Sequence, residues 1–346
     1  MKLIIAFLFL IIFRDVSAAP AGLQRHWTSV SDPLLMGTYD LKFTGLPLHG
    51  KVADGKTYWS GSYWAKQSGN INYRWNSSGK EGFDLPSPSR LKVSSMTLEE
   101  LKTLAPSEKF DLFTGRYDYP LVKEVATHAS LKAKPWEGIC HGWAAATMNY
   151  PEPMPVVAIN PHGLKVPFGS NDIKALLSYY YAYHFKAPTS QVGKRCYNDS
   201  DCEEDLNAGA FHIILANRLG LGGKGFIADL DPHKQVWNHP INGYESLILE
   251  ESVPTALSAV GTVRVLKIKT RVFYVSESMD TWGTVLGTQF QIGGTKEYFY
   301  ELELDAESFI LGGEWTSAEK PDFIWLKGRP EEFRGILSSL KALLKT

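Results

Sequence analysis

The chain is poor in the features that mark several large classes of protein. It has only three cysteines in 346 residues, and its 36 basic and 37 acidic side chains almost cancel. A balanced charge without a basic stripe argues against nucleic acid as a partner. The sequence also lacks zinc-ligand spacing, a phosphate-binding loop, a dinucleotide fingerprint and internal repeats. These absences leave a globular protein long enough to bury one large core or two.

Long apolar runs are scarce as well, and the one that stands out lies at the N-terminus. Residues 3–13 form an apolar run after Lys2, and residues 16–18 are small, as at a cleavage position. The run is too short to span a bilayer comfortably. We therefore predict a signal peptide over residues 1–18 and no transmembrane segment in the mature chain. This places the protein outside the cell, in the periplasm or in the cell envelope; the alternative is an uncleaved N-terminal anchor.

The three cysteines differ in their surroundings. Cys196 and Cys202 lie close together, and in an exported protein this spacing predicts a local disulfide. Cys140 is then a free thiol. Residues 140–148 are rich in alanine and predict a helix that begins at Cys140. The first turn of a helix favours a thiolate and can receive an oxyanion, although a lone cysteine in a helix is usually a small core residue.

The rest of the chain divides into two regions. Residues 19–95 are rich in Gly, Ser and aromatic residues, and we interpret them as a propeptide or an integral lobe. Residues 96–346 are predicted to form an α+β domain with a strand-rich C-terminal part. Short strands are predicted at 58–64 and 71–75, helices at 96–104, 170–184 and 331–345, and alternating strands at 263–275 and 298–304.

Two further segments contain the other candidate reactive residues. Residues 209–217 and 225–231 predict strands joined by a glycine-rich turn. In a simple hairpin, His212 and Asp229 would lie directly opposite each other, with Cβ atoms ~5 Å apart. A thiol, an imidazole and a carboxylate are the parts of a nucleophilic acyl-transfer triad.

The residues alone leave the choice of histidine and aspartate open. His212 lies in an apolar segment, where a satisfied core histidine is the competing interpretation. His239 is its rival, and Asp231 is the rival of Asp229. Weaker candidate histidines are His162, His184 and His233.

An acidic run covers residues 199–205. Such a run is usually a solvated loop. Its alternating oxygens could hold Ca²⁺, but the spacing is not that of an EF-hand. We predict no metal site and no required cofactor, with Ca²⁺ as the alternative.

Several blocks of sequence carry a resemblance to a known family. They are Val236-Trp237-Asn238-His239-Pro240 and residues 138–144, 208–217, 226–229, 312–315 and 321–325. Together they resemble the elicitor-type transglutaminases first known from oomycete cell walls, over about residues 55–326. The oomycete peptide has Gln where this chain has His239.

The resemblance implies a papain-like arrangement with Cys140 as nucleophile, His212 as base and Asp229 as its orienter. The nucleophile would lie at the start of a helix packed on an antiparallel sheet. The Cys140 amide would form half of an oxyanion hole, with an indole such as that of Trp136 or Trp143 as the second donor. Substrate contacts are assigned to Trp136, Trp143, Trp237 and Asn238.

The implied reaction joins a protein glutamine to Cys140 as a thioester and transfers the acyl group to a lysine or a small amine. The partners would therefore be proteins with accessible glutamine and lysine. A papain-like cysteine peptidase or a glutamine deamidase would use the same triad. A surface protein that binds a partner without catalysis is the third interpretation.

Overall fold

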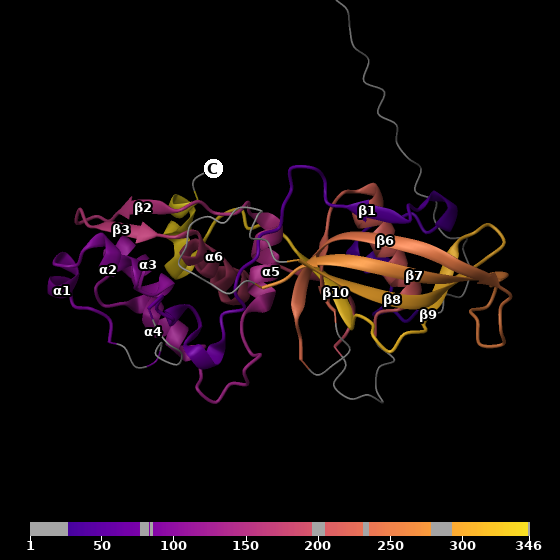
Figure 1. Ribbon diagram of the computed structural model, residues 1–346, viewed down its shortest axis with the longest axis horizontal. Helices are drawn as coiled ribbons and strands as arrows, with labels where there is room; N and C mark the ends of the chain where they lie inside the picture. The colour runs from indigo at the N-terminus through magenta and orange to yellow at the C-terminus, as the bar shows by residue number, and fades with distance from the viewer. Residues whose placement is uncertain are drawn as a thin grey trace, which may run out of the picture.

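The computed structural model describes residues 27–76, 83, 86–195, 205–230, 235–277 and 293–344. These form a helical lobe and a sheet lobe that lie side by side (Figure 1). Among the described residues, every helix is too short or too polar to cross a bilayer. The proposed signal peptide, Cys196, Cys202, Asp231, His233 and all but the last residue of the acidic run lie outside the described residues.

The helical lobe is built from short helices around a buried central one. Its elements are α1 (Arg90–Ser94), α2 (Leu98–Lys102), α3 (Pro106–Phe113), α4 (Pro120–Thr127), α5 (Cys140–Asn149), α6 (Ser170–Tyr179), the pair β2 (Val156–Ile159) and β3 (Lys165–Phe168), and a 3₁₀ segment Gly335–Leu343. All ten residues of α6 are buried. Asp172 in its first turn accepts the Gly169 amide at 2.7 Å and pairs with Lys109 at 2.8 Å, so this buried carboxylate is both hydrogen-bonded and paired.

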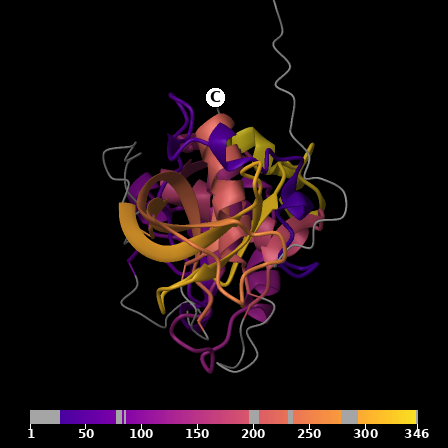
Figure 2. The ribbon, with the colours of Figure 1, turned by 90° about the vertical axis from the view of Figure 1, so that its right-hand side faces the viewer.

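The sheet lobe is an antiparallel sheet curved around one helix. Its strands are β1 (His49–Lys51), β4 (Thr189–Gly193), β5 (Phe226–Asp229), β6 (Asn238–Ser252), β7 (Arg264–Val275), β8 (Gly293–Leu304), β9 (Ile310–Trp315) and β10 (Phe323–Lys327). The order is β4-β10-β5-β6-β7-β8-β9, and β1 pairs with β6. Helix α7 (Ala208–Leu215) lies inside the curve against β8 and β9 (Figure 2).

Helix α5 joins the two lobes. It packs on α6 on one side and on β6 and β5 on the other. One core cluster accordingly contains Trp143 and Leu176 of the helical lobe together with Ile227 and Trp325 of the sheet lobe. The start of α5, where Cys140 lies, is therefore held by both lobes.

The prediction of a strand at 209–217 is wrong, because these residues form α7. The Asn207 side chain caps the helix by accepting the amides of Gly209 and Ala210. All eight residues of α7 are buried, so the helix has no exposed polar face and its hydrophobicity shows no helical period. A short continuous apolar run of this kind cannot be distinguished from a strand by periodicity.

The aromatic segments near the N-terminus also differ from the prediction. In place of strands at 58–64 and 71–75, the chain is irregular with short 3₁₀ turns at Lys66–Ser68 and Asn70–Asn72. Trp59 and Trp64 are buried in the helical lobe, whereas β1 pairs with the sheet lobe. The described part of residues 19–95 therefore packs on both lobes.

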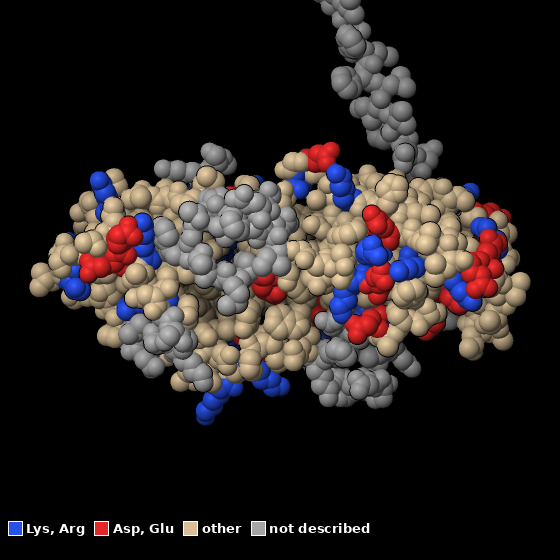
Figure 3. Space-filling model, in the orientation of Figure 1, with Lys and Arg blue, Asp and Glu red and all other residues tan. Residues whose placement is uncertain are grey.

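Most other predicted elements are confirmed. Helix α5 begins at Cys140, and α6 begins at Ser170 and continues as a π-helical turn over Tyr180–His184. Strands β7 and β8 cover the two alternating segments. The last helix is shorter than predicted and is a 3₁₀ segment. Figure 3 shows interspersed charges of both signs on one face of the sheet lobe. Arg271 on β7 and Glu297 on β8 form an exposed ion pair at 2.8 Å.

Candidate active site

Two glycines set the position of Cys140. A Cβ atom at Gly138 would lie 2.2 Å from the carbonyl oxygen of Tyr63, and one at Gly142 would lie 2.1 Å from that of Ser178. The Ile139 amide donates to the same Tyr63 oxygen at 2.6 Å. The small residues on both sides of Cys140 therefore serve close backbone packing, which fixes where α5 begins.

The Cys140 thiol is enclosed by the residues at the start of β6 and just before it. Its side chain is 6% exposed. The Asn238 Nδ2 group donates to Sγ at 3.6 Å, and the thiol lies 3.8 Å from the carbonyl oxygen of Val236. Trp325 on β10 donates its indole N–H to Asn238 Oδ1 at 2.7 Å. The sulfur thus has a hydrogen-bond donor whose orientation is itself fixed.

The first backbone amides of α5 are available to a ligand. Within the described residues, the amides of Cys140 and His141 donate no hydrogen bond. The first amides of a helix have no intrahelical partner and bear partial positive charge. They can therefore receive an oxyanion formed on a carbonyl attacked by Cys140.

Asp229 lies near the thiol, but its side chain binds the segment at the start of β6. The register of β5 and β6 places it opposite Asn238, and its Oδ1 accepts the Trp237 amide at 2.9 Å. Asp229 is fully buried. It therefore holds the segment that carries Asn238.

The pKa of the Cys140 thiol is raised above its ordinary value of 9.0, contrary to the expectation from the helix start. Burial is the largest cause, and the negative charges of Glu277 and Asp229 add to the increase. The backbone and side-chain hydrogen bonds of Asn238 act in the opposite direction. The resting thiol is consequently protonated at neutral pH.

The structure does not bring His212 to Cys140. His212 lies in the middle of α7, where its Nδ1 is 2.8 Å from the hydroxyl of Tyr300 and its ring stacks on Phe43 with centroids 5.7 Å apart. Among the described residues, its Nε2 has no hydrogen-bond partner. The strand partners of Asp229 are Asn238 and Phe323, so the expected pairing of His212 with Asp229 is wrong. Burial lowers the pKa of His212 to about 4, which keeps it neutral.

The other described histidines do not replace it as a partner of the sulfur. His239 follows Asn238 on β6, but its Nδ1 lies 3.1 Å from the Val275 carbonyl oxygen and its ring packs against Tyr274. His141 has a pKa lowered to about 4, chiefly by burial. In the part of the chain that the structure describes, no imidazole hydrogen-bonds Sγ of Cys140.

The four predicted substrate contacts fall in different places. Trp143 has no exposed surface and donates its indole N–H to the Trp59 carbonyl, so it is a packing residue and cannot contact a substrate or an oxyanion. Trp136 lies in the loop before α5, beside the side chains of Lys134 and Arg195. Trp237 packs edge-on against Tyr63. Asn238 contacts the sulfur itself.

Sequence reasoning missed three groups around the thiol. They are Trp325, Glu277 and the Val236 carbonyl. Trp325 lies inside one of the blocks that carry the family resemblance, and that block was the available signal. Glu277 had none, because its position follows from how β7 ends.

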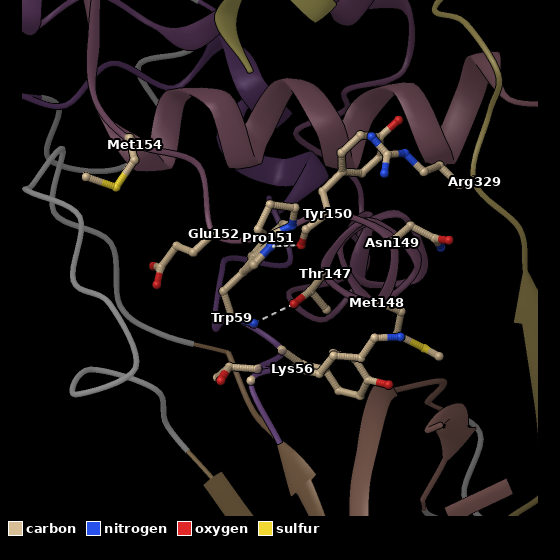
Figure 4. A pocket seen from close by; sticks show the side chains of 13 residues that line it. Lys56, Trp59, Thr147, Met148, Asn149, Tyr150, Pro151, Glu152, Met154 and Arg329 are labelled. Carbon is tan, nitrogen blue, oxygen red and sulfur yellow. Dashed lines mark hydrogen bonds between the residues drawn. The ribbon is translucent and has the colours of Figure 1, made fainter. Parts of the chain in front are cut away.

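A pocket of about 550 Å³ opens at the other end of α5 (Figure 4). It is lined by Lys56, Trp59, Thr147, Tyr150, Glu152 and Arg329, among others. Cys140 is not among the lining residues. The two ends of α5 are nine residue steps apart, which corresponds to about 13 Å along the helix. The thiol site is therefore not this pocket. Among the described residues, no group of three His, Cys, Asp or Glu side chains could hold a metal ion.

Comparisons with known proteins agree with this architecture. A comparison with curated protein sequences found no match. The chain is similar to the crystal structure of the GP42 transglutaminase from Phytophthora sojae, with a TM-score of 0.69 and 21% identity over 93% of this chain and 98% of the other. At this identity the likeness shows the fold. The family model described as Transglutaminase elicitor matches residues 122–336, more than half of the chain, and the chain belongs to that family.

Proposed function

We propose that the protein is an exported protein-glutamine γ-glutamyltransferase with Cys140 as its nucleophile. The observation that carries the proposal is the position of Cys140. The thiol lies at the first residue of α5, between two lobes, with unpaired helix amides on one side and the Asn238 amide on the other. Family membership supports a transglutaminase-type reaction.

The reaction has two transfers. The Cys140 sulfur attacks the γ-carboxamide carbon of a protein glutamine; the S–C bond forms, the C–N bond breaks, and ammonia leaves with the proton that the thiol gives up. A lysine amine then attacks the thioester carbon; the N–C bond forms, the S–C bond breaks, and an amine proton returns to the sulfur. In both steps the oxyanion would be received by the amides of Cys140 and His141.

His212 is not part of this mechanism, because its ring is enclosed in the core around α7. Asp229 keeps a role, which differs from the orientation of an imidazole. By accepting the Trp237 amide it holds the start of β6 against α5. The parts of the papain-like prediction on which this proposal relies are a nucleophile on a helix and an antiparallel sheet beside it.

The second candidate function is binding without catalysis. It is favoured by the low exposure and raised pKa of the thiol and by the remote position of His212. A deamidase would form the same γ-glutamyl thioester and transfer it to water in place of an amine. A cysteine peptidase would attack a main-chain carbonyl, break the peptide bond and also use water as the acceptor.

One assay separates these functions. The protein is incubated with a fluorescent primary amine and a glutamine-rich protein, in parallel with the glutamine-rich protein alone. Incorporation of the amine supports the transglutaminase. Ammonia release without incorporation indicates a deamidase, and cleavage of the protein indicates a peptidase. If none of the three reactions is observed, the proposal is overturned in favour of a protein that binds without catalysis.

A further inference from the structure

We propose that Asn238 is a catalytic residue whose side-chain amide stabilises the Cys140 thiolate, and that Trp325 is the positioning residue that keeps this amide correctly oriented. The inference rests on the proposed function in one respect, that Cys140 is the nucleophile. Its geometry is a chain of two hydrogen bonds, from Trp325 Nε1 to Asn238 Oδ1 at 2.7 Å and from Asn238 Nδ2 to Cys140 Sγ at 3.6 Å.

The orientation of Asn238 follows from the chemistry of the indole. An indole nitrogen donates a hydrogen bond and cannot accept one. The atom of Asn238 that faces Trp325 must therefore be the oxygen, and the NH₂ group must face the sulfur. Asn238 is 4% exposed and Trp325 is 7% exposed, so little water competes for either bond.

The main chain reinforces this arrangement. The backbone N–H of Asn238 also acts to lower the pKa of Cys140, in the same direction as the side-chain amide. The preceding residue, Trp237, is anchored through its amide to Asp229 Oδ1 at 2.9 Å. Asn238 is thus fixed from three strands, β5, β6 and β10.

The charges around the thiol make this donor matter. Among the described residues, the charged groups that act on the sulfur are Glu277, which follows β7, and Asp229 on β5, and both disfavour the thiolate. On its own helix, the neighbour His141 has a pKa lowered to about 4 and is neutral. His239 on β6 binds the Val275 carbonyl and makes no bond to the sulfur. Within the described chain, the Asn238 hydrogen bonds therefore favour the thiolate together with the first amides of α5.

Removing the indole N–H would release the amide. Trp325→Phe keeps an aromatic ring at this position but removes the N–H donor to Asn238 Oδ1. The Asn238 side chain can then turn about its Cβ–Cγ bond. The oxygen would then face the sulfur and repel a thiolate. Asn238→Ala removes the donor directly, and Asn238→Asp places a carboxylate beside the sulfur with almost no change in size.

The test is the rate of Cys140 alkylation by iodoacetamide as a function of pH, measured by mass spectrometry of the peptide that contains Cys140. The rate of alkylation depends on the fraction of Cys140 that is present as thiolate. We expect Trp325→Phe and Asn238→Ala to react about tenfold more slowly at neutral pH, with the midpoint of the pH profile moved upward, and Asn238→Asp to react more slowly still.

Trp315→Phe is the matched control. Its indole also donates to a buried acceptor, the Leu206 carbonyl at 2.6 Å, but in the core of the sheet lobe. It should lose stability to heat as Trp325→Phe does and keep the parental pH profile. A parental profile in Trp325→Phe and both Asn238 variants would overturn the inference.

The same measurement separates this inference from the proposed function. Alkylation needs no acyl donor or acceptor. A shifted profile in a protein that incorporates no amine would sustain the role of Asn238 and reject the transglutaminase. Should Trp325→Phe fail to fold, the comparison of Asn238→Ala with Asn238→Asp decides the question, and equal profiles for these two variants and the parent would reject the role.

Discussion

Helix α5 lies between the two lobes, whereas α7 lies inside one of them. Both helices are short and apolar, and each follows a non-helical segment. Each carries one residue with reactive chemistry. Around Cys140, the contacts come from Asn238 at the start of β6 and from Val236 just before it, and they include a donor and a carbonyl. Around His212, the contacts are the stacked ring of Phe43 and a hydroxyl. Position between lobes, more than residue type, distinguishes a reactive group from a structural one.

The environment of His212 explains how a buried imidazole is tolerated. Its Nδ1 begins a chain of hydrogen bonds through the hydroxyls of Tyr300, Thr270 and Ser246, each of the last two links 2.7 Å long. Ser246 is partly exposed, so the chain runs from the core to the surface of the sheet. This satisfies one ring nitrogen and leaves the ring neutral.

The largest effect should come from the nucleophile. Cys140→Ala is expected to reduce amine incorporation by several orders of magnitude, because a covalent mechanism cannot proceed without its nucleophile. Far-UV circular dichroism and thermal unfolding should match the parent, since the side chain is small. A variant that kept a tenth of the parental rate would rule out the mechanism.

The second prediction concerns stability in acid and tests the structural role of His212. Its pKa is about 4 in the folded protein against an ordinary 6.5, so the unfolded chain binds this proton more tightly. Stability is therefore fully present above pH 6.5 and falls as pH drops towards 4, by about 3 kcal/mol from this group. His212→Leu should lose less stability than the parent between pH 7 and pH 4, measured by urea unfolding.

The matched control for that experiment is His49→Gln on the exposed face of β1, which should behave as the parent does. The parent and both variants keep His141, so the difference between them reports His212. His212→Leu should also leave the pH profile of Cys140 alkylation unchanged. A slower alkylation in this variant would return His212 to the active site.

The smallest expected effect is that of Glu277→Gln. The negative charge of Glu277 raises the pKa of Cys140, so its removal should lower that pKa and speed alkylation at neutral pH about twofold. Glu319→Gln, which removes a carboxylate paired with Lys296 at 2.7 Å on the surface, is the control. Equal rates for the two variants would show that Glu277 does not act on the thiol.

The sequence was informative wherever a local signal decides the structure. Helix α5 followed from the alanine-rich residues 140–148, and the strands β7 and β8 followed from their alternation. Helix α7 was mistaken for a strand because enclosure on all sides removes the polar face that reveals a helix. That one error also produced the false hairpin and the pairing of His212 with Asp229.

The site itself depends on contacts that no local pattern contains. Asn238 and Cys140 are 98 residues apart, and Trp325 is a further 87 residues from Asn238. Trp325 meets Asn238 because β5 lies between β10 and β6, and Asn238 meets Cys140 because α5 packs on β6. The resemblance supplied Cys140, Asp229 and Asn238 as site residues, but only the structure shows that the Asn238 amide faces the sulfur.

The enclosure of α7 has a consequence for how the protein is made. The helix is complete at Leu215, whereas the strands that cover it, β8 and β9, begin at Gly293 and Ile310. A helix without a polar face therefore leaves the ribosome well before its cover, and synthesis of the intervening residues takes about 4–15 s at typical rates. During that interval α7 has no stable place in water, so a chain that ends before β8 should aggregate.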